Sequence, residues 1–416
     1  MNILQVNKFL WEHAGPERYM FEVSQLLESN GHTVEYFAMQ HERNRASANA
    51  SYFVKHIEYR DTSVAYKLRT FRETVEKTVY SPEARRKMDA LLESHHYDIA
   101  HLHMISHQIS PSILSALKRR RVPVVQTLHE YKLICPASHL YIKHRGEICE
   151  RCVSGAYINA LRYRCLKDSA AASGLASVAQ YIHRWTRIHE RNIDLFLCPS
   201  GFLAQKHIEG GVPEAKIRVL QNYLDLQGYE PKYEPGEYAV FIGRLSEEKG
   251  IETLIKAAAA LPQLPLLIVG EGEQRPVLEE LVQRQNLRHI TFAGYQSGDE
   301  LKATIQNAAF LVLPSEWYEN CPMVTYEAYA LGKPVVASDI GGVGESIDYG
   351  ATGLLFKPGD IAGLRRAMTE LWGGRARCES MGRAGRIKVE RICGRHYDLL
   401  LGLYEEARSL SAASAA

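Results

Sequence analysis

The chain has 416 residues, more than one compact core usually holds, so we expect two domains of roughly 200 residues each. Hydrophobic residues make up 46% of the chain and charged residues 24%, which argues against a disordered chain and permits large cores. We find no basic leader followed by an apolar run and no apolar stretch of about 18 residues, which argues against a signal peptide and a membrane span. A soluble cytoplasmic protein is the simplest interpretation.

The net charge of +2 hides an uneven distribution. Residues 1–222 carry 30 Lys and Arg against 22 Asp and Glu, whereas the remainder carries 20 against 26. The net charge of +8 on residues 1–222 favours contact with an anionic acceptor, a membrane surface or nucleic acid. For a single cluster, such as residues 118–121, a solvated surface at the end of a helix is the alternative.

The first half alternates short apolar runs with helical patterns. In chain order, the runs of strand length are NILQV, HTVEYFA, DIAHLH, VPVVQTL, DLFLCPS and KIRVLQN. Residues 44–95 are less regular. The following stretch, YLDLQGYEPKYEPGE, is rich in Pro, Gly and Tyr and has no period, so it predicts an interdomain linker. We therefore place an N-terminal domain at residues 1–222.

The second half is more regular. Its apolar runs are YAVFIGRL, LPLLIVGEGE, HITFAGY, AFLVLPSE, KPVVASDI and TGLLFKP, with helical patterns between them. Continuous apolar strands alternating with helices predict a parallel sheet covered on both faces. We place this second Rossmann-like domain at residues 223–390. At 391–416 we expect a C-terminal helix that crosses back to the first domain, followed by a disordered tail. Two such domains predict a central cleft at the carboxyl ends of the strands.

Two carboxylates surround the expected start of one helix in the second half. Glu319 and Glu327 lie eight positions apart, and the helix begins near Pro322, a residue favoured at a first helical position. The free N–H groups of Met323 and Val324 predict an anion site suited to a diphosphate, with the carboxylates accepting from sugar hydroxyls. The alternative is an exposed helical Glu327 and a Glu319 that only favours the helix dipole.

Further polar and glycine residues follow other strands of the same domain. Arg244 and Lys249 lie at a turn after a strand, where they are suited to neutralise a leaving diphosphate. Gly270 and Gly272 follow the next strand, where the backbone must approach a ligand or turn tightly. The pattern is not G-x-G-x-x-G, so a nicotinamide cofactor gains little support.

Taken together, these motifs resemble the retaining glycosyltransferases with the GT-B fold, in the family called family 4 or glycosyl transferases group 1. The resemblance covers nearly the whole chain and is strongest over residues 238–356. The matching motifs are Glu-x7-Glu, GRLSEEKG, VGEGE, FAGY and EAYALGKPVVASDIGGVGE. In the first half, HAGPERYMFEVSQLL resembles the family's glycine-rich loop, with Ala14-Gly15 in place of Gly-Gly. QTLHE resembles the segment of the active-site histidine, and VLQNYLD keeps only Asn222 of the interdomain motif.

The resemblance implies roles for matched residues. Arg244 and Lys249 would hold the donor diphosphate, Glu319 a hydroxyl of the transferred sugar, and Glu327 the ribose. His129 would contact the sugar's distal hydroxyl, although His101 and His103 also end a strand and compete for this role. The implied catalytic set is His129, Arg244, Lys249 and Glu319. The implied donor-binding set is Gly15, Gly270, Glu271, Tyr295, Asn320, Cys321, Met323, Val324 and Glu327.

The implied activity is retaining transfer of a hexose from a UDP- or GDP-sugar to a carbohydrate or lipid-linked saccharide, in surface polysaccharide or glycoconjugate synthesis. The chain contains no Asp-x-Asp, so we expect the two cations to act without a catalytic metal. One alternative is a GT-B epimerase or phosphorylase. Another is a nucleic-acid-binding protein, although basic residues alternate poorly with stacking aromatics, so we expect no nucleic acid partner.

Four cysteines raise a separate question: Cys135, Cys149, Cys152 and Cys165. They fall in a loop-rich insert at about 135–165, and in a reducing cytosol such clustering suggests a structural zinc site. An iron–sulfur cluster is a weaker alternative, and unligated thiols are another. Residues 55–77 combine basic and aromatic side chains, so peripheral contact with the inner face of a membrane is a lesser hypothesis beside an ordinary acceptor-side helix.

Overall fold

The computed structural model describes residues 1–12, 14–56 and 73–413, and its contacts divide the chain into two compact units. Unit 1 comprises Met1–Leu140, Cys149–Tyr223 and His396–Ala416, and unit 2 comprises Tyr141–Ile148 and Leu224–Arg395. Most of the basic and aromatic stretch 55–77 lies outside the described residues. The sequence predicts domain limits at residues 222 and 390. That these limits separate independently folding domains stays a prediction.

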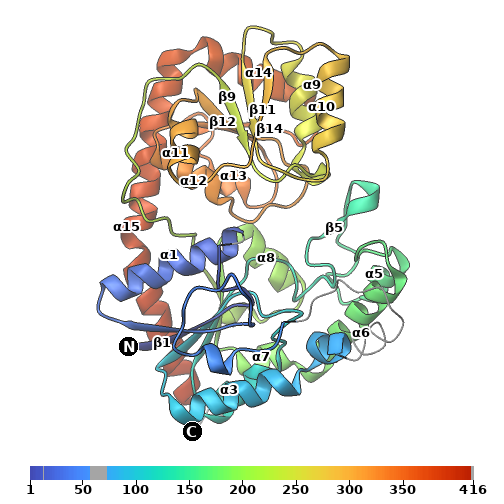
Figure 1. The fold of residues 1–416 in the computed structure, drawn as a ribbon, viewed down its shortest axis with the longest axis vertical. Coiled ribbons are helices and arrows are strands. Elements are labelled where there is room, and N and C mark those ends of the chain that lie inside the picture. Colours follow the sequence, from blue (N-terminus) through green and yellow to red (C-terminus); the bar gives the residue numbers. More distant parts are fainter. Residues whose placement is uncertain (13, 57–72, 414–416) are drawn as a thin grey trace. The chain divides into compact units, whose positions relative to one another are not determined.

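Unit 1 is built on a six-stranded parallel sheet (Figure 1). Its strands, in spatial order, are β2 (Thr33–Phe37), β1 (Asn2–Val6), β3 (Ile99–Leu102), β4 (Val124–Thr127), β7 (Leu195–Cys198) and β8 (Ile217–Val219). β3, β4 and β7 are buried along their whole length, which is why they read as continuous apolar runs.

The helices of unit 1 cover this sheet and connect its parallel strands. They are α1 (Gly15–Ser29), α3 (Pro82–Ser94), α4 (Ser112–Arg119), α5 (Ile158–Arg162), α6 (Ala170–Thr186), α7 (Ile188–Asn192) and α8 (Gly201–Glu209). Short 3-10 turns occupy Ala50–Tyr52 and Glu214–Lys216. Among the helices that the structure describes, none combines the length and apolar character needed to cross a membrane.

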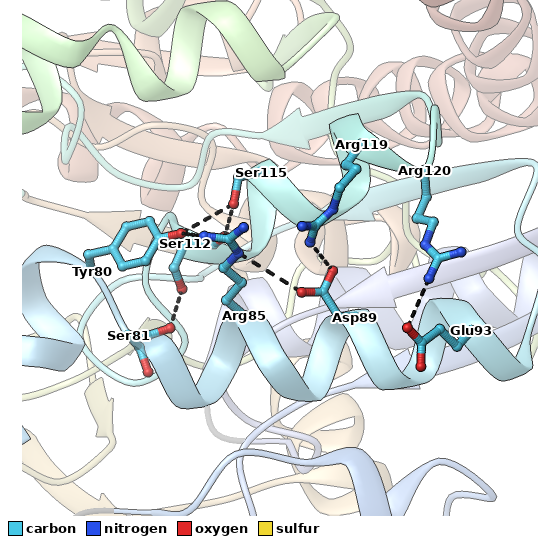
Figure 2. Close-up of polar contacts among 9 residues, drawn as sticks. All are labelled: Tyr80, Ser81, Arg85, Asp89, Glu93, Ser112, Ser115, Arg119 and Arg120. Carbon is cyan, nitrogen blue, oxygen red and sulfur yellow. Dashed lines mark hydrogen bonds and ion pairs between the residues drawn. The ribbon is translucent and has the colours of Figure 1, made fainter.

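Two side chains of the basic cluster at 118–121, those of Arg119 and Arg120, point toward carboxylates on α3 (Figure 2). Arg119 forms an ion pair with Asp89, and Arg120 Nη2 lies 3.0 Å from Glu93 Oε1. Arg85 lies 3.9 Å from the same aspartate. Because two of its four cations already face carboxylates, this cluster supports the interpretation of a solvated helix surface rather than an anion-binding patch.

Unit 2 contains the second six-stranded parallel sheet. Its strands, in spatial order, are β11 (Ile290–Gly294), β10 (Leu266–Val269), β9 (Ala239–Ile242), β12 (Phe310–Leu313), β13 (Val335–Ser338) and β14 (Gly353–Phe356). The hairpin of β5 (Tyr141–Ile142) and β6 (Glu147–Ile148), joined by a 3-10 turn at Lys143–Arg145, is grouped with this unit. Two parallel α/β sheets confirm the predicted pair of Rossmann-like domains.

The helices of unit 2 follow its strands. They are α9 (Ile251–Ala258), α10 (Arg275–Arg284), α11 (Gly298–Gln306), α12 (Met323–Ala330), α13 (Val343–Ser346) and α14 (Ile361–Gly373), with a 3-10 turn at Glu247–Lys249. The core joins the sheet to α9 and α14 through buried Leu254, Ile255, Leu364 and Met368. The last helix, α15 (Arg375–Ala413), belongs to unit 2 up to Arg395 and to unit 1 from His396.

Candidate active site

The residues predicted to bind the donor gather at one edge of the sheet in unit 2. Arg244 lies just after β9, Glu271 just after β10, and Glu319 in the loop after β12. Because these strands are parallel and neighbours in the sheet, the loops at their carboxyl ends meet. The structure therefore places these motifs at one edge of the sheet.

Lys249 and Glu319 form an ion pair at this edge. The distance from Lys249 Nζ to Glu319 Oε1 is 2.5 Å, and Ser315 Oγ donates to the same oxygen at 2.8 Å. The Lys249 ammonium also lies 5.4 Å from the centre of the Trp317 ring. With only 21% and 12% of the two side chains exposed, the pair is shielded from water and held in one geometry.

Glycines make this pairing geometrically feasible. Gly250 has φ +67°, and a Cβ built on it would lie 1.9 Å from the Pro314 carbonyl oxygen, so the turn carrying Lys249 contacts the loop after β12 directly. On the other side, the Gly342 N–H donates to the Glu319 carbonyl at 2.7 Å. The backbone on both sides of the ion pair is therefore fixed.

The pKa of Glu319 reflects two opposed effects. Burial by itself raises the pKa of this carboxyl. The positive charge of Lys249, together with hydrogen bonds from neighbouring side chains, outweighs burial and holds the Glu319 pKa below its usual range. Glu319 is therefore a carboxylate at neutral pH, able to accept a hydrogen bond from a hydroxyl group.

Arg244 is held by Glu248, a residue to which the sequence reasoning gave no role although it lies within the GRLSEEKG motif. Arg244 Nη2 lies 2.8 Å from Glu248 Oε1, which also accepts from Ser246 Oγ at 2.8 Å. Burial by itself raises the Glu248 pKa. Hydrogen bonds and the positive charges of Arg244 and Lys249 outweigh burial, so the Glu248 pKa lies below its usual value. The second oxygen, Oε2, is buried and has no hydrogen-bond partner among the described residues.

Gly270 and Gly272 allow the loop after β10 to lie close to the backbone of the loop after β9. A Cβ on Gly270 would lie 1.9 Å from the Gly243 carbonyl oxygen, and one on Gly272 would lie 2.2 Å from that of Leu245. Gly270 also has φ +140°. Both glycines therefore let the loop after β10 pack on the loop after β9, as a tight turn requires. Contact of Gly270 with a donor stays a prediction.

Two residues of the predicted donor-binding set, Glu271 and Tyr295, directly follow the neighbouring strands β10 and β11. Glu271 forms an ion pair with Arg275, whose Nε also lies 2.8 Å from Glu279 Oε1. A Cβ on Gly294 would lie 3.4 Å from Glu271 Oε1, so the loops after β10 and β11 are adjacent. Tyr295 is 74% exposed, which leaves its ring open for stacking.

The first turn of α12 has the features expected of an anion site. The helix begins at Met323 after Pro322, and no side chain caps its first N–H groups, which include that of Val324. Glu327 is buried, so the alternative of an exposed helical glutamate is wrong. In the preceding loop, which contains Asn320, the buried Cys321 thiol donates to Tyr326 Oη at 3.3 Å.

In unit 1, His129 follows β4 and contacts His103. His129 Nε2 lies 3.0 Å from His103 Nδ1, and His103 Nε2 lies 2.8 Å from Gln5 Oε1. The Tyr19 ring meets His129 edge-on at 5.6 Å. Burial lowers the pKa of His129 to about 3, so the imidazole is neutral at neutral pH.

The two histidines that competed with His129 have structural partners. His101 is fully buried, with Nδ1 2.8 Å from Tyr404 Oη on α15 and Nε2 2.7 Å from Thr127 Oγ1. His103 is 1% exposed and supports His129 as described. The sequence pattern could not separate the three, because each follows or ends a buried strand.

At the start of α1, whose first residue is Gly15, the Glu17 side chain accepts two hydrogen bonds. The Ala14 N–H donates to Glu17 Oε2 at 3.2 Å, and Asn7 Nδ2 donates to Glu17 Oε1 at 3.0 Å. Glu17 is 2% exposed, so a buried acidic side chain already occupies this helix N-terminus. Contact of Gly15 with the donor stays a prediction.

The predicted four-cysteine metal site is not supported. Among the described residues, no group of three or more His, Cys, Asp or Glu is arranged to hold a metal ion. Cys135 and Cys152 are buried, while Cys149 and Cys165 are partly exposed. Burial, followed by the proximity of the other cysteines, raises the pKa of Cys152 to about 12 and that of Cys165 to about 11. The Cys152 and Cys165 thiols are therefore protonated at neutral pH in this structure.

Comparison with known protein families matches both halves of the chain. The model of "Glycosyltransferase Family 4" matches residues 13–227, and that of "Glycosyl transferases group 1" matches residues 226–388. The chain belongs to glycosyltransferase family 4. Within this glycosyltransferase, the second match contains the Lys249–Glu319 pair and α12, and the first contains His129.

Characterised relatives of the glycosyltransferase resemble part of its chain. A glycogen synthase of Mycobacterium tuberculosis is 35% identical over 185 residues, which cover 42% of this chain and 44% of that protein. A sulfoquinovosyl transferase of Arabidopsis thaliana is 28% identical over 232 residues, covering 52% and 43%. The chain thus spans less than half the length of these relatives.

Solved structures resemble the whole glycosyltransferase in fold. Anabaena Alr3699/HepE in complex with UDP has a TM-score of 0.65 at 18% identity, covering 97% of this chain and 100% of that one. TarM, a further solved structure, has a TM-score of 0.68 at 12% identity, covering 97% and 98%. Both likenesses concern the fold alone, and together with the two parallel sheets they identify it as GT-B.

Proposed function

We propose that this glycosyltransferase moves a hexose from a UDP- or GDP-sugar to a carbohydrate or lipid-linked saccharide in surface polysaccharide or glycoconjugate synthesis. The observation that carries the proposal is the Lys249–Glu319 ion pair, with Arg244 on the same loop as Lys249 and the uncapped start of α12 close to Glu319 in sequence. A cation, a carboxylate and free N–H groups at one sheet edge are the chemistry that a sugar diphosphate requires.

The proposed chemistry depends on charge development. When a glycosyl–phosphate bond breaks, the sugar becomes oxocarbenium-like and negative charge builds up on the diphosphate. Fixed cations stabilise that charge more strongly in the transition state than in the ground state, which lowers the barrier. We assign this role to Arg244, Lys249 and the first N–H groups of α12. Because Glu248 holds Arg244 in place, little reorganisation is needed when the donor binds.

The carboxylates and the histidine would recognise the sugar parts of the donor. Glu319, ionised and fixed by Lys249, is suited to accept from a hydroxyl of the transferred hexose. Buried Glu327 is assigned to the ribose, and neutral His129 to the distal hydroxyl of the hexose. We further propose retention of anomeric configuration without a catalytic metal, as the family resemblance and the missing Asp-x-Asp suggest.

Structural neighbours support UDP as the nucleotide. Anabaena HepE was solved with UDP-glucose, and Staphylococcus aureus TarM with UDP and saccharides. GDP remains the second choice, because Tyr295 and Glu271 would meet either base. We propose a cytoplasmic location, with peripheral contact at the inner membrane face as an extension for a lipid-linked acceptor.

The test is a thermal-shift screen of the full chain against UDP-, GDP- and ADP-sugars, followed by transfer assays with the donor that binds. We expect stabilisation by a UDP- or GDP-sugar and transfer to a saccharide. Epimerisation or phosphorolysis of the donor without an acceptor would favour the alternative enzyme class. Salt-dependent binding of RNA or DNA, with no nucleotide-sugar binding, would overturn the proposal.

A further inference from the structure

Helix α6 of unit 1 exposes a row of large apolar side chains. The row consists of Val178, Tyr181, Ile182 and Trp185. Their spacing of i, i+3, i+4 and i+7 places them on one face of the helix. Trp185, at 85% exposed, and Val178, at 54%, are almost uncovered. Single exposed apolar side chains are normal on a protein surface, but a continuous row on one helix face is not.

The buried face of α6 is made of small and polar residues instead. They are Ser173, Ala176, Ser177, Ala179, Gln180 and His183. Ser177 Oγ donates to the Tyr157 carbonyl at 2.8 Å, and Gln180 Nε2 donates to the Leu133 carbonyl at 2.6 Å. A surface helix of a globular protein normally buries its apolar face and exposes its polar one. The reversed polarity of α6 therefore indicates that its apolar face is used for contact with a partner.

Helix α5 extends the apolar face. Its first residue, Ile158, is 55% exposed, and the Ile158 N–H donates to Tyr181 Oη at 3.1 Å. The Tyr157 and Tyr181 rings meet edge-on with their centres 5.1 Å apart. Both helices lie at the periphery of unit 1 (Figure 1). We call the exposed residues Ile158, Val178, Tyr181, Ile182 and Trp185 the α5–α6 patch.

Cations accompany the patch. Residues 151–187 include six Lys and Arg but a single acidic residue, Asp168. Arg162 lies four positions after Ile158 on α5, and Arg184 lies three positions after Tyr181 on α6, so helical spacing places each beside the patch. Both arginines are exposed, and neither forms an ion pair with any residue that the structure describes. The border of the patch therefore carries uncompensated positive charge.

This combination matches the surface of an anionic membrane. A helix that lies in the membrane interface presents Trp and aliphatic side chains on its apolar face and basic side chains beside them. Trp and Tyr favour the headgroup level, and arginines meet the lipid phosphates. A second copy of the chain fits less well, because a two-fold interface would set the same arginines against each other.

We propose that the α5–α6 patch binds an anionic membrane surface, with Ile182 and Trp185 inserted at the headgroup level and Arg162 and Arg184 against lipid phosphates. Binding to the membrane follows from the patch alone. Its purpose, to bring the enzyme to a lipid-linked acceptor, rests on the proposed function.

The test is cosedimentation of the full chain with vesicles of phosphatidylcholine alone and of equal parts phosphatidylcholine and phosphatidylglycerol. At about 0.1 M salt we expect the anionic vesicles to bind at least about ten-fold more tightly than the neutral ones. Salt at about 1 M should weaken this binding, because it screens exposed charges. Absence of binding to the anionic vesicles, or equal binding to both kinds, overturns the proposal.

A pair of apolar substitutions locates the contact. Ile182→Ser with Trp185→Ser should weaken binding to the anionic vesicles about ten-fold or more, because it removes the inserted side chains. Ile387→Ser with Leu399→Ser is the matched control, since these residues are exposed apolar side chains of α15. An equal loss in the control overturns the assignment to the patch.

A pair of charge substitutions tests the arginines. Arg162→Gln with Arg184→Gln should weaken binding about ten-fold, whereas Arg162→Lys with Arg184→Lys should retain most of it, because the charge persists. Arg284→Gln with Arg366→Gln removes the same charge from exposed side chains of α10 and α14 and should change little. Equal losses in the Gln pair and this control would contradict a local role of the arginines.

Two further measurements separate the outcomes. Sedimentation velocity reports self-association, and association that Ile182→Ser with Trp185→Ser abolishes, without vesicle binding, would assign the patch to an interface between copies and overturn the proposal. Thermal stabilisation by the sugar donor reports on the transferase function. It should persist in every variant, so a failure of membrane binding and a failure of the proposed function are distinguishable.

Discussion

The Lys249 ammonium lies 2.5 Å from the Glu319 carboxylate, although the two residues are 70 positions apart in the sequence. The pair joins the turn after β9 to the loop after β12, so one contact fixes a candidate diphosphate-binding cation and a candidate sugar-binding carboxylate together. Lys249 therefore keeps the Glu319 pKa low, and the contact fixes the positions of both groups.

Removal of Lys249 should abolish most transfer. Lys249→Ala removes a fixed cation from the developing diphosphate charge, so kcat/KM should fall about 100-fold or more. Lys256→Ala is the matched control, since Lys256 forms an exposed pair with Glu252 on α9. Steady-state kinetics with the identified donor provide the measurement. A similar rate in the Lys249 variant and in the control would contradict the proposed role.

The loss of folding stability in acid should depend on Glu319. Its pKa is lower in the folded chain than the unfolded value near 4.5, so its contribution to stability is fully present above that value. It is lost as the pH falls below about 4.5 and through the folded pKa, because the unfolded state binds the proton first. Urea unfolding of Glu319→Gln should therefore show a weaker pH dependence below 4.5 than the parent. Identical slopes would refute the ion pair's contribution.

The His129 imidazole should stay neutral across the physiological range. Its pKa is lowered to about 3 by burial, so it should take up no proton between pH 8 and pH 5. Because the unfolded histidine binds a proton near pH 6.5, this residue costs stability as the pH falls below that value. Nitrogen-15 NMR of the imidazole is the measurement. A titration midpoint near 6.5 would show that His129 is exposed to solvent.

Transfer should be insensitive to chelation. If Arg244, Lys249 and the start of α12 neutralise the diphosphate, EDTA should leave the initial rate unchanged within error. The measurement compares rates with EDTA, with EDTA followed by Mg²⁺, and with neither. Loss of activity with EDTA and recovery with Mg²⁺ would mean that a cation shares the diphosphate with the protein.

Gly270 should tolerate no side chain. Gly270→Ala places a Cβ 1.9 Å from the Gly243 carbonyl oxygen at φ +140°, so the free energy of unfolding should fall by about 2 kcal/mol or more. Gly298→Ala is the control, since it has φ +56° with no atom within 4 Å of the added Cβ, and it should cost about 1 kcal/mol. Denaturant unfolding measures both. Equal losses would exclude the backbone contact as the cause.

Much of the architecture could be predicted from local sequence patterns. Runs such as VPVVQTL and AFLVLPSE became buried strands β4 and β12, because a strand covered on both faces needs apolar side chains at every position. The motif residues of unit 2 were placed at one sheet edge for the same reason: each directly follows such a strand. These features depend only on neighbours in the sequence.

Other features required the three-dimensional structure. The sequence could not show that Glu248 holds Arg244, that His103 rather than His101 contacts His129, or that the four cysteines lack a metal-binding arrangement. The close contact of Gly270 with Gly243 likewise appears only in the structure. In each case the deciding partner lies on another loop or strand.

The sequence by itself determined the two parallel α/β sheets, the family and the residue types that follow the strands. The tertiary structure alone decided which of those residues pair, which are buried and which pKa values shift. The physical reason is that strand formation follows from the periodicity of adjacent side chains, whereas ion pairs and desolvation depend on distances between atoms far apart in the chain.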